Sequence, residues 1–303
     1  MRNVIPVSAS QEHKDRLFNF IFGRLENRKW TLSLYNAVNN TGYEDETKIE
    51  FNTLDDYLYV SMQNDTSFLF AEYVNLYEHQ STYNPNMPLR MMQYISAIYN
   101  KYITANELNK YGSKIMRLPV PKLVVFYNGS KAEPDEKILK LSDSFPKATR
   151  ENADIEVRVR MININHGHNR RLMNACKPLY EYAWFVQRIR ELKSDSDDLG
   201  VAVGKALEAM PEEYLLKPFL KEHMAEVTNM LSAELQEINA KEMIARANFR
   251  EGEKRGEKKG LARLSDLINW LFSQNRIDDV KKAAKDPEYL EKMFEEYDEC
   301  QKK

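Results

Sequence analysis

Two acidic residues on neighbouring predicted strands have the spacing to share one metal ion. Asp65 directly precedes the strand-like run 66–70, and Glu78 lies near the end of the next run, which begins at Tyr73. A hairpin with a two-residue loop pairs Asp65 with Glu78, so that their Cβ atoms lie about 5 Å apart on one face of the sheet. A four-residue loop keeps this register, whereas a three-residue loop places the two acids on opposite faces. The predicted acidic pair therefore depends on the length of this turn.

The residues that follow Glu78 would complete such a site. Gln80 is two positions further along the strand and shares the face of Glu78, while the His79 side chain points to the other face. Facing carboxylates repel, and Mg²⁺ offsets the repulsion by taking oxygen ligands from one or two carboxylates together with water and phosphate. We therefore predict Asp65, Glu78 and the His79 main-chain carbonyl as ligands of Mg²⁺, with Mn²⁺ and Ca²⁺ as alternatives. A plainer interpretation is that Asp65 caps a turn and Glu78 is a solvated charge.

The elements that position these residues alternate between helices and strands. Periodic apolar residues predict one or two helices over 11–38, and the short gaps between the next three runs require an antiparallel meander. A helix that starts at Asn86–Pro88 is predicted to have Met92, Ile95, Tyr99 and Tyr102 on one face. Together these elements predict an α/β fold with a mixed sheet. The predicted strands are Tyr57–Met62, Thr66–Phe70, Tyr73–Glu78, Lys122–Tyr127 and Ile155–Ile164, and a long helix follows at Asn169–Leu192.

A polar, acidic break at residues 193–198 divides the chain in the sequence. We predict a first domain over 1–195 and a helical C-terminal region over 196–303, with terminal short helices over 261–298. The segment 250–260 is charged and interrupted by glycine, so we expect it to be mobile or ordered only by an oligomer partner. The C-terminal region is therefore predicted to form a homo-oligomer.

Composition excludes several classes of protein. The chain has 44 Lys+Arg and 46 Asp+Glu, a net charge of −2, which argues against one large basic surface for nucleic acid but permits a local groove. Apolar residues make up 43%, enough for a packed core, but the apolar runs are far shorter than the roughly 18 residues that a membrane span needs. With no apolar leader and only Cys176 and Cys300, we expect a cytoplasmic protein without a disulfide framework or a thiolate metal site. Cys176 is predicted to lie in the core, and the pair His166 and His168 to form a strand-to-helix turn.

Four segments resemble one family of bacterial nucleases. They are Asp15–Phe18, Asn64–Phe68, Glu78–Thr82 with Asn84–Arg90, and Val124–Gly129. They are similar to the recombination-promoting nucleases, also described as putative transposases, of the PD-(D/E)XK superfamily. The likeness covers roughly residues 10–190.

The resemblance implies a restriction-endonuclease-like core and metal-dependent cleavage of DNA phosphodiester bonds. Asp65 and Glu78 match the metal-binding acids, and Gln80 stands where the broad superfamily has Lys. A neutral amide orients water or a phosphate oxygen by hydrogen bonding, but it brings no positive charge. Some nucleases of this type use an acid on the first helix, which makes Asp15 a minor candidate, although an acid in a first turn is more often a helix-dipole partner.

The chemistry predicted from these residues is hydrolysis of DNA. Arg90, in the first turn of the next helix, is our candidate phosphate contact, because a guanidinium matches phosphate oxygens in a bidentate manner. It is equally explained as a solvated helix charge. The alternative functions are a non-catalytic DNA- or protein-binding module on a degenerate nuclease fold, and a structural oligomer built on the C-terminal helices.

Overall fold

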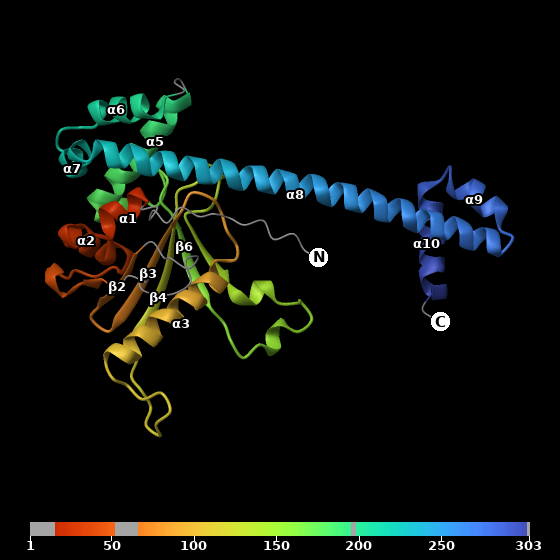
Figure 1. Ribbon diagram of the computed structural model, residues 1–303, viewed down its shortest axis with the longest axis horizontal. Helices are drawn as coiled ribbons and strands as arrows, with labels where there is room; N and C mark the ends of the chain where they lie inside the picture. Colours follow the sequence, from red (N-terminus) through yellow and green to blue (C-terminus); the bar gives the residue numbers. More distant parts are fainter. Residues whose placement is uncertain (1–15, 52–65, 195–197, 302–303) are drawn as a thin grey trace. The chain divides into compact units, whose positions relative to one another are not determined.

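The computed structural model describes residues 16–51, 66–194 and 198–301. The chain forms two compact units, Met1–Ile238 and Asn239–Lys303 (Figure 1). The polar break at residues 193–198 does not coincide with this division, because side chains from residues 202–231 belong to the core of the first unit.

A mixed sheet forms the centre of the first unit. Within the described residues it has six strands in the order β1-β2-β3-β4-β6-β5. Strands β3, β4 and β6 are parallel to one another, and the outer pairs β1–β2, β2–β3 and β5–β6 are antiparallel. The α/β class and the mixed sheet are thus as predicted. The strands are β1 (Glu50–Phe51), β2 (Thr66–Phe70), β3 (Tyr73–Gln80), β4 (Val120–Tyr127), β5 (Glu136–Lys140) and β6 (Arg158–Asn163).

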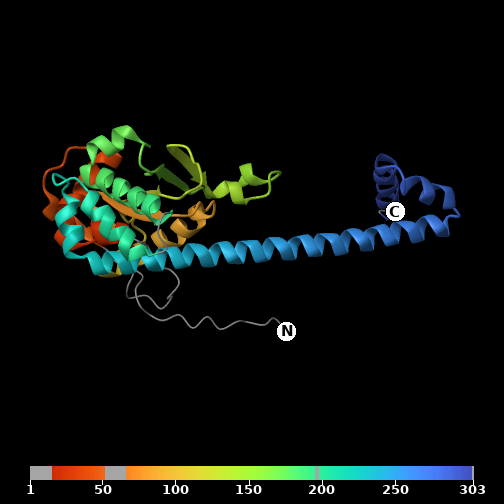
Figure 2. The same cartoon turned by 90° about the horizontal axis from the view of Figure 1, so that it is seen from above.

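Helices cover both faces of this sheet. The helix α3 packs on one face through an apolar core that includes Met91, Val125 and Met161. A larger core on the other face joins the sheet to α1, α2, α5, α6, α7 and the start of α8, and Figure 2 shows α5 to α7, in green to teal, grouped beside the start of α8. The helices of this unit are α1 (Leu17–Phe22), α2 (Arg28–Asn39), α3 (Met87–Ala105), α4 (Arg170–Ala175), α5 (Lys177–Ser194), α6 (Leu199–Ala209), α7 (Leu216–Glu222) and the first part of α8 (Met224–Ser273).

The β2–β3 hairpin has the register predicted for a two-residue loop. Phe70 lies opposite Tyr73, and Thr66 lies opposite Tyr77. Ala71, in the turn, has a φ of 54°, in the left-handed region. The predicted strand Tyr57–Met62 lies outside the described residues. The hairpin places Glu78 and Gln80 on the face of the sheet that α3 covers.

The face of α3 that is most buried is offset by about one residue from the predicted apolar face, of which Ile95 and Tyr99 are partly buried against the core. The helix buries Met87, Met91, Tyr94 and Ile98, whereas the predicted face held Met92, Ile95, Tyr99 and Tyr102. Apolar residues occur around most of this helix, so both sets fit helical spacing. Contact with the sheet determines which set is buried, and the spacing of apolar residues along the helix carries no information about that contact.

The predicted long helix over Asn169–Leu192 is two helices. Cys176 separates α4 from α5 and has extended backbone angles of φ −129° and ψ 90°. The cause is Pro178, which has no N–H to continue the hydrogen bonds of α4 and which fits best in the first turn of a new helix. The strand predicted at Ile155–Ile164 begins at Arg158, and β5 was not predicted.

The second unit is helical. The later part of α8 packs with α9 (Ile277–Ala283) and α10 (Pro287–Gln301) around Leu267, Leu271, Ala283 and Met293. The helix α8 continues through the glycine-containing segment 250–260. Good helix formers surround these glycines, and Arg255 pairs with Glu251 one turn away. Among all the described residues, no helix combines the length and the apolar character that crossing a membrane requires.

Candidate functional site

Glu78 is a buried carboxylate near the carboxyl end of β3. The residue is only 2% exposed, and its Oε1 accepts a hydrogen bond of 2.6 Å from Arg90 Nη2. Arg90 reaches it from the first turn of α3, which starts after the short connection that follows Gln80. Asn86 occupies the N-cap position of this helix without a side-chain capping hydrogen bond, and Pro88 lies in the first turn, so the local sequence helps to set where the guanidinium is presented.

Arg90 is held in place by Tyr94 as well as by Glu78. Its Nε and Nη2 donate to the Tyr94 hydroxyl over 3.2 and 2.8 Å. Desolvation alone would lower the pKa of Arg90, but the Glu78 carboxylate and the Tyr94 hydrogen bond outweigh it, and the pKa is raised. The guanidinium is therefore a permanent charge that neutralises a buried acid, and its side chain keeps 35% exposure to solvent.

Gln80 lies beside Glu78 on the same face of the sheet, as predicted. It is 7% exposed, and its Nε2 donates to Met87 Sδ at the start of α3. Its main-chain carbonyl accepts from the Asn128 N–H over 2.8 Å, which joins the ends of β3 and β4. Gln80 thus shares the sheet face of the Glu78 carboxylate, and contacts with the start of α3 and with the residue after β4 hold it in position.

The His79 side chain points to the opposite face, also as predicted. Its Nε2 lies 2.9 Å from the Tyr182 hydroxyl, and its ring stacks on Phe18 with 5.3 Å between centroids. The His79 main-chain carbonyl accepts a hydrogen bond from Arg16, whose guanidinium also lies 3.5 Å from Glu237. A cation would have to share this carbonyl with a positively charged side chain.

The described residues supply only part of the ligand set that a divalent ion needs. Asp65 and Asp15 lie outside the described residues. Among the residues that are described, no group of three or more His, Cys, Asp or Glu side chains could hold a metal ion. The described donors are one carboxylate, from Glu78, and one amide, from Gln80. Oxygen donors of this kind suit Mg²⁺, which takes one or two carboxylates and completes its shell with water and phosphate.

Two other predictions concerned His166, His168 and Cys176. His168 Nδ1 lies 2.6 Å from Asp135 Oδ1, while the His166 ring lies against Tyr180, so the two histidines face different partners. Cys176 is buried in the core, as predicted. The sequence did not reveal Asp135 as a partner, because it precedes a strand that was not predicted.

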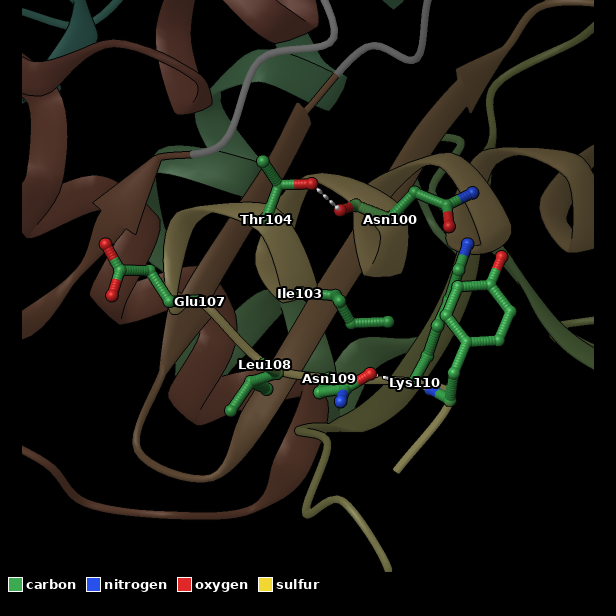
Figure 3. A pocket seen from close by; sticks show the side chains of 8 residues that line it. Asn100, Ile103, Thr104, Glu107, Leu108, Asn109 and Lys110 are labelled. Atoms are coloured by element: carbon green, nitrogen blue, oxygen red, sulfur yellow. Dashed lines mark hydrogen bonds between the residues drawn. The ribbon is translucent and has the colours of Figure 1, made fainter. Parts of the chain in front are cut away.

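A hollow at the far end of α3 is separate from these residues. It has a volume of about 610 Å³, and Figure 3 shows the Thr104 hydroxyl within it, hydrogen-bonded to the Asn100 carbonyl. At 1.5 Å per helical residue it lies about 20 Å from Arg90 along the helix. One acid and one lysine in its wall do not make a catalytic set. Its lining residues are Asn100, Ile103, Thr104, Glu107, Leu108, Asn109, Lys110 and Tyr111.

Comparison with known proteins gives one family. The model of a family described as "Putative transposase, YhgA-like" matches residues 48–199, half of the chain. The matched range includes Asp65, Glu78, Gln80 and Arg90. No curated protein and no solved structure matches the chain. The family description points to a transposase-related, nuclease-type function and to DNA as the partner. The chain therefore belongs to the YhgA-like putative transposase family, which is part of the PD-(D/E)XK Rpn-like superfamily.

Proposed function

We propose that this chain is a divalent-metal-dependent DNA endonuclease that hydrolyses phosphodiester bonds and promotes DNA recombination. The observation that supports it best is the buried Glu78 carboxylate, which shares a sheet face with the Gln80 amide and lies beside the Arg90 guanidinium. A carboxylate, an amide and a guanidinium are the groups needed to hold a hard cation, a water molecule and a phosphate. Family membership makes DNA the natural substrate.

Asp65 and Glu78 are the proposed metal ligands, with the His79 carbonyl as a further donor. The pairing of Thr66 with Tyr77 supports this choice, because a register continued by one residue would oppose Asp65, which lies outside the described residues, to Glu78. When bound, Mg²⁺, or alternatively Mn²⁺ or Ca²⁺, would polarise the scissile phosphate and lower the pKa of a coordinated water molecule.

The remaining residues position the reactants. Gln80 orients the attacking water or a phosphate oxygen through its amide, which both donates and accepts hydrogen bonds. Arg90 contacts the phosphate, because its side chain is one-third exposed and its Nη1, which Glu78 and Tyr94 do not engage and which lies 3.4 Å from Met87 Sδ, has an N–H to donate. Tyr94 keeps the guanidinium aimed at this end of the sheet.

Nicking of supercoiled plasmid tests the proposal. Asp65→Ala and Glu78→Gln should each abolish nicking in Mg²⁺, while both chains remain folded by circular dichroism. Glu72→Gln, which removes an exposed carboxylate from the turn of the same hairpin, is the matched control and should nick like the wild type. Full cleavage by both site variants would show that these acids are not the metal ligands.

A second function is favoured by the ion pair itself. Arg90 already neutralises the negative charge of Glu78, so this carboxylate does not require a metal ion for charge balance. The same arrangement would suit a DNA- or protein-binding module on a degenerate nuclease fold. Titration with Mg²⁺ and Mn²⁺ separates the two functions: DNA binding without nicking at any concentration of either ion would favour the module.

We further propose that the helical C-terminal region forms a homo-oligomer. Two copies would provide one active site for each strand of a duplex, which suits a double-strand cut. Light scattering on the full chain, and on a chain that ends at Ile238, the boundary of the first unit, tests this. A full chain that is monomeric at all concentrations would exclude the homo-oligomer. The same result would also exclude a purely structural role that depends on oligomer formation.

A further inference from the structure

A tyrosine flanked by two lysines lies on the α3 face of the sheet, outside the residues discussed above. Lys137 Nζ is 3.2 Å from the Tyr83 hydroxyl and 4.6 Å from the centre of its ring. Lys131 Nζ approaches the same ring, 5.6 Å from its centre. We call Tyr83, Lys131 and Lys137 the lysine–tyrosine patch.

The strand register relates this patch to Glu78. Glu78 pairs with Val125, Val125 with Met161, and Met161 with Lys137, so one row of partners crosses four strands. Paired residues share a face, and Val125 and Met161 lie in the core beneath α3. With neighbouring strands about 4.8 Å apart, Lys137 is about 14 Å from Glu78 along this row.

Three different segments bring the patch together. Tyr83 comes from the connection between β3 and α3, Lys131 from the connection between β4 and β5, and Lys137 from β5. The Tyr127 hydroxyl donates to the Lys131 carbonyl over 2.7 Å, and Tyr83 packs against the core under α3. The patch is therefore anchored on the sheet and is not a set of independent surface side chains.

The charge of the patch favours an anionic partner. The hydrogen bond with Tyr83 raises the pKa of Lys137, which keeps this side chain an ammonium. The Glu133 carboxylate, 7% exposed, lies 3.5 Å from the Lys137 ammonium and offsets one of the two positive charges. Lys131 is exposed and Lys137 is 40% exposed, so both ammonium groups remain accessible to solvent.

We propose that the lysine–tyrosine patch contacts the DNA backbone away from the bond that is cut. This inference rests on the proposed function and identifies where the chain holds the flanking part of its substrate. A distance of about 14 Å corresponds to about four nucleotides of a B-form strand, at 3.4 Å per nucleotide. Lysine contacts with phosphate do not depend on base sequence, so the patch gives affinity and register, not sequence preference.

The salt dependence of binding tests the patch. Each phosphate contact contributes about 0.9 to the slope of log K against log salt concentration. Because Glu133 offsets one of the two positive charges, Lys131→Ala/Lys137→Ala should lower the steepness of this slope by about 0.9, so that wild type loses about 3.5-fold more affinity than this variant between 50 and 200 mM salt. Fluorescence anisotropy with a short labelled DNA duplex in EDTA measures this without cleavage.

The control removes the same charge elsewhere. Lys29→Ala/Lys205→Ala changes two exposed lysines on α2 and α6, which cover the other face of the sheet, and should leave the slope unchanged. Equal slopes for wild type and the patch variant, or no DNA binding by wild type, would overturn the inference.

Plasmid nicking by wild type separates this inference from the proposed function. Nicking together with equal slopes overturns the patch and leaves the nuclease standing. A slope difference without nicking in Mg²⁺ or Mn²⁺ supports the patch and overturns hydrolysis.

Discussion

Replacement of Arg90 by alanine should destabilise the chain, because the buried negative charge of Glu78 would lose the guanidinium that neutralises it. The Glu78 side chain is 3% exposed and lies 2.6 Å from the guanidinium. Removing one partner of a fully buried ion pair costs about 3–5 kcal/mol. Because the Arg90 side chain is 35% exposed and water screens part of the interaction, we expect about 2–3 kcal/mol. For a unit of this size, this loss lowers Tm by roughly 4–12 °C.

A double substitution identifies the cause of this loss. Glu78→Gln keeps the shape of the side chain but removes its charge, so Glu78→Gln/Arg90→Ala should be more stable than Arg90→Ala by about 1–2 kcal/mol. Unfolding is best measured in urea with EDTA, because guanidinium chloride is a salt that screens ion pairs. Arg188→Ala breaks an exposed pair with Glu191 and should cost under about 0.5 kcal/mol.

Two results would refute this reasoning. If Arg90→Ala is as stable as the wild type, the buried carboxylate does not depend on the guanidinium. If Glu78→Gln/Arg90→Ala is no more stable than Arg90→Ala, the loss comes from the missing arginine stem and its Tyr94 contacts, not from an uncompensated charge.

Three further predictions concern other parts of the first unit and one thiol of the second. Burial raises the pKa of Cys176 to about 11, so a thiol reagent at about pH 8 should modify only Cys300 until the chain unfolds; two reactive thiols in the native chain would contradict this. Burial also raises the pKa of Glu181 above its ordinary value of 4.5. The protonated Glu181 side chain therefore contributes to the stability of the fold below about pH 4.5, and this contribution is lost as the pH rises through the raised pKa. Glu181→Gln, which still accepts the Leu216 N–H, should be at least as stable as wild type in thermal unfolding at about pH 7 and lose this advantage in acid, and a less stable variant at pH 7 would refute it. Ala71→Gly should stabilise the hairpin turn by about 1 kcal/mol in urea unfolding, because Ala71 has a φ of 54°, and an unchanged midpoint would refute the strain.

Local sequence was sufficient for the β2–β3 hairpin and for the faces of its side chains. A two-residue loop determines which residues oppose one another, and alternation then places Glu78 and Gln80 together and His79 on the other side. The start of α3 was predictable for the same reason, since Asn86 and Pro88 are local signals.

Features that depend on distant contacts could not be predicted. Which face of α3 is buried is decided by the sheet, and β5 is a short edge strand whose alternate residues are mostly exposed. The sequence predicts Arg90 as a phosphate contact, but its pairing with Glu78 depends on how α3 packs against β3. The relation of Lys137 to Glu78 requires the order of four strands, which no local pattern contains.

The ion pair of Arg90 and Glu78 connects the stability of the fold to its proposed chemistry. A buried carboxylate requires a compensating positive charge, and the Arg90 guanidinium provides it for Glu78. A divalent ion at the same carboxylate would compete with Arg90, and the displaced guanidinium would be free to bind phosphate. A structural ion pair would instead be indifferent to added Mg²⁺. If Glu78 is a metal ligand, Arg90→Ala should increase the amount by which Mg²⁺ raises the free energy of unfolding. If the ion pair serves only the fold, Mg²⁺ should leave the free energy of unfolding of Arg90→Ala unchanged.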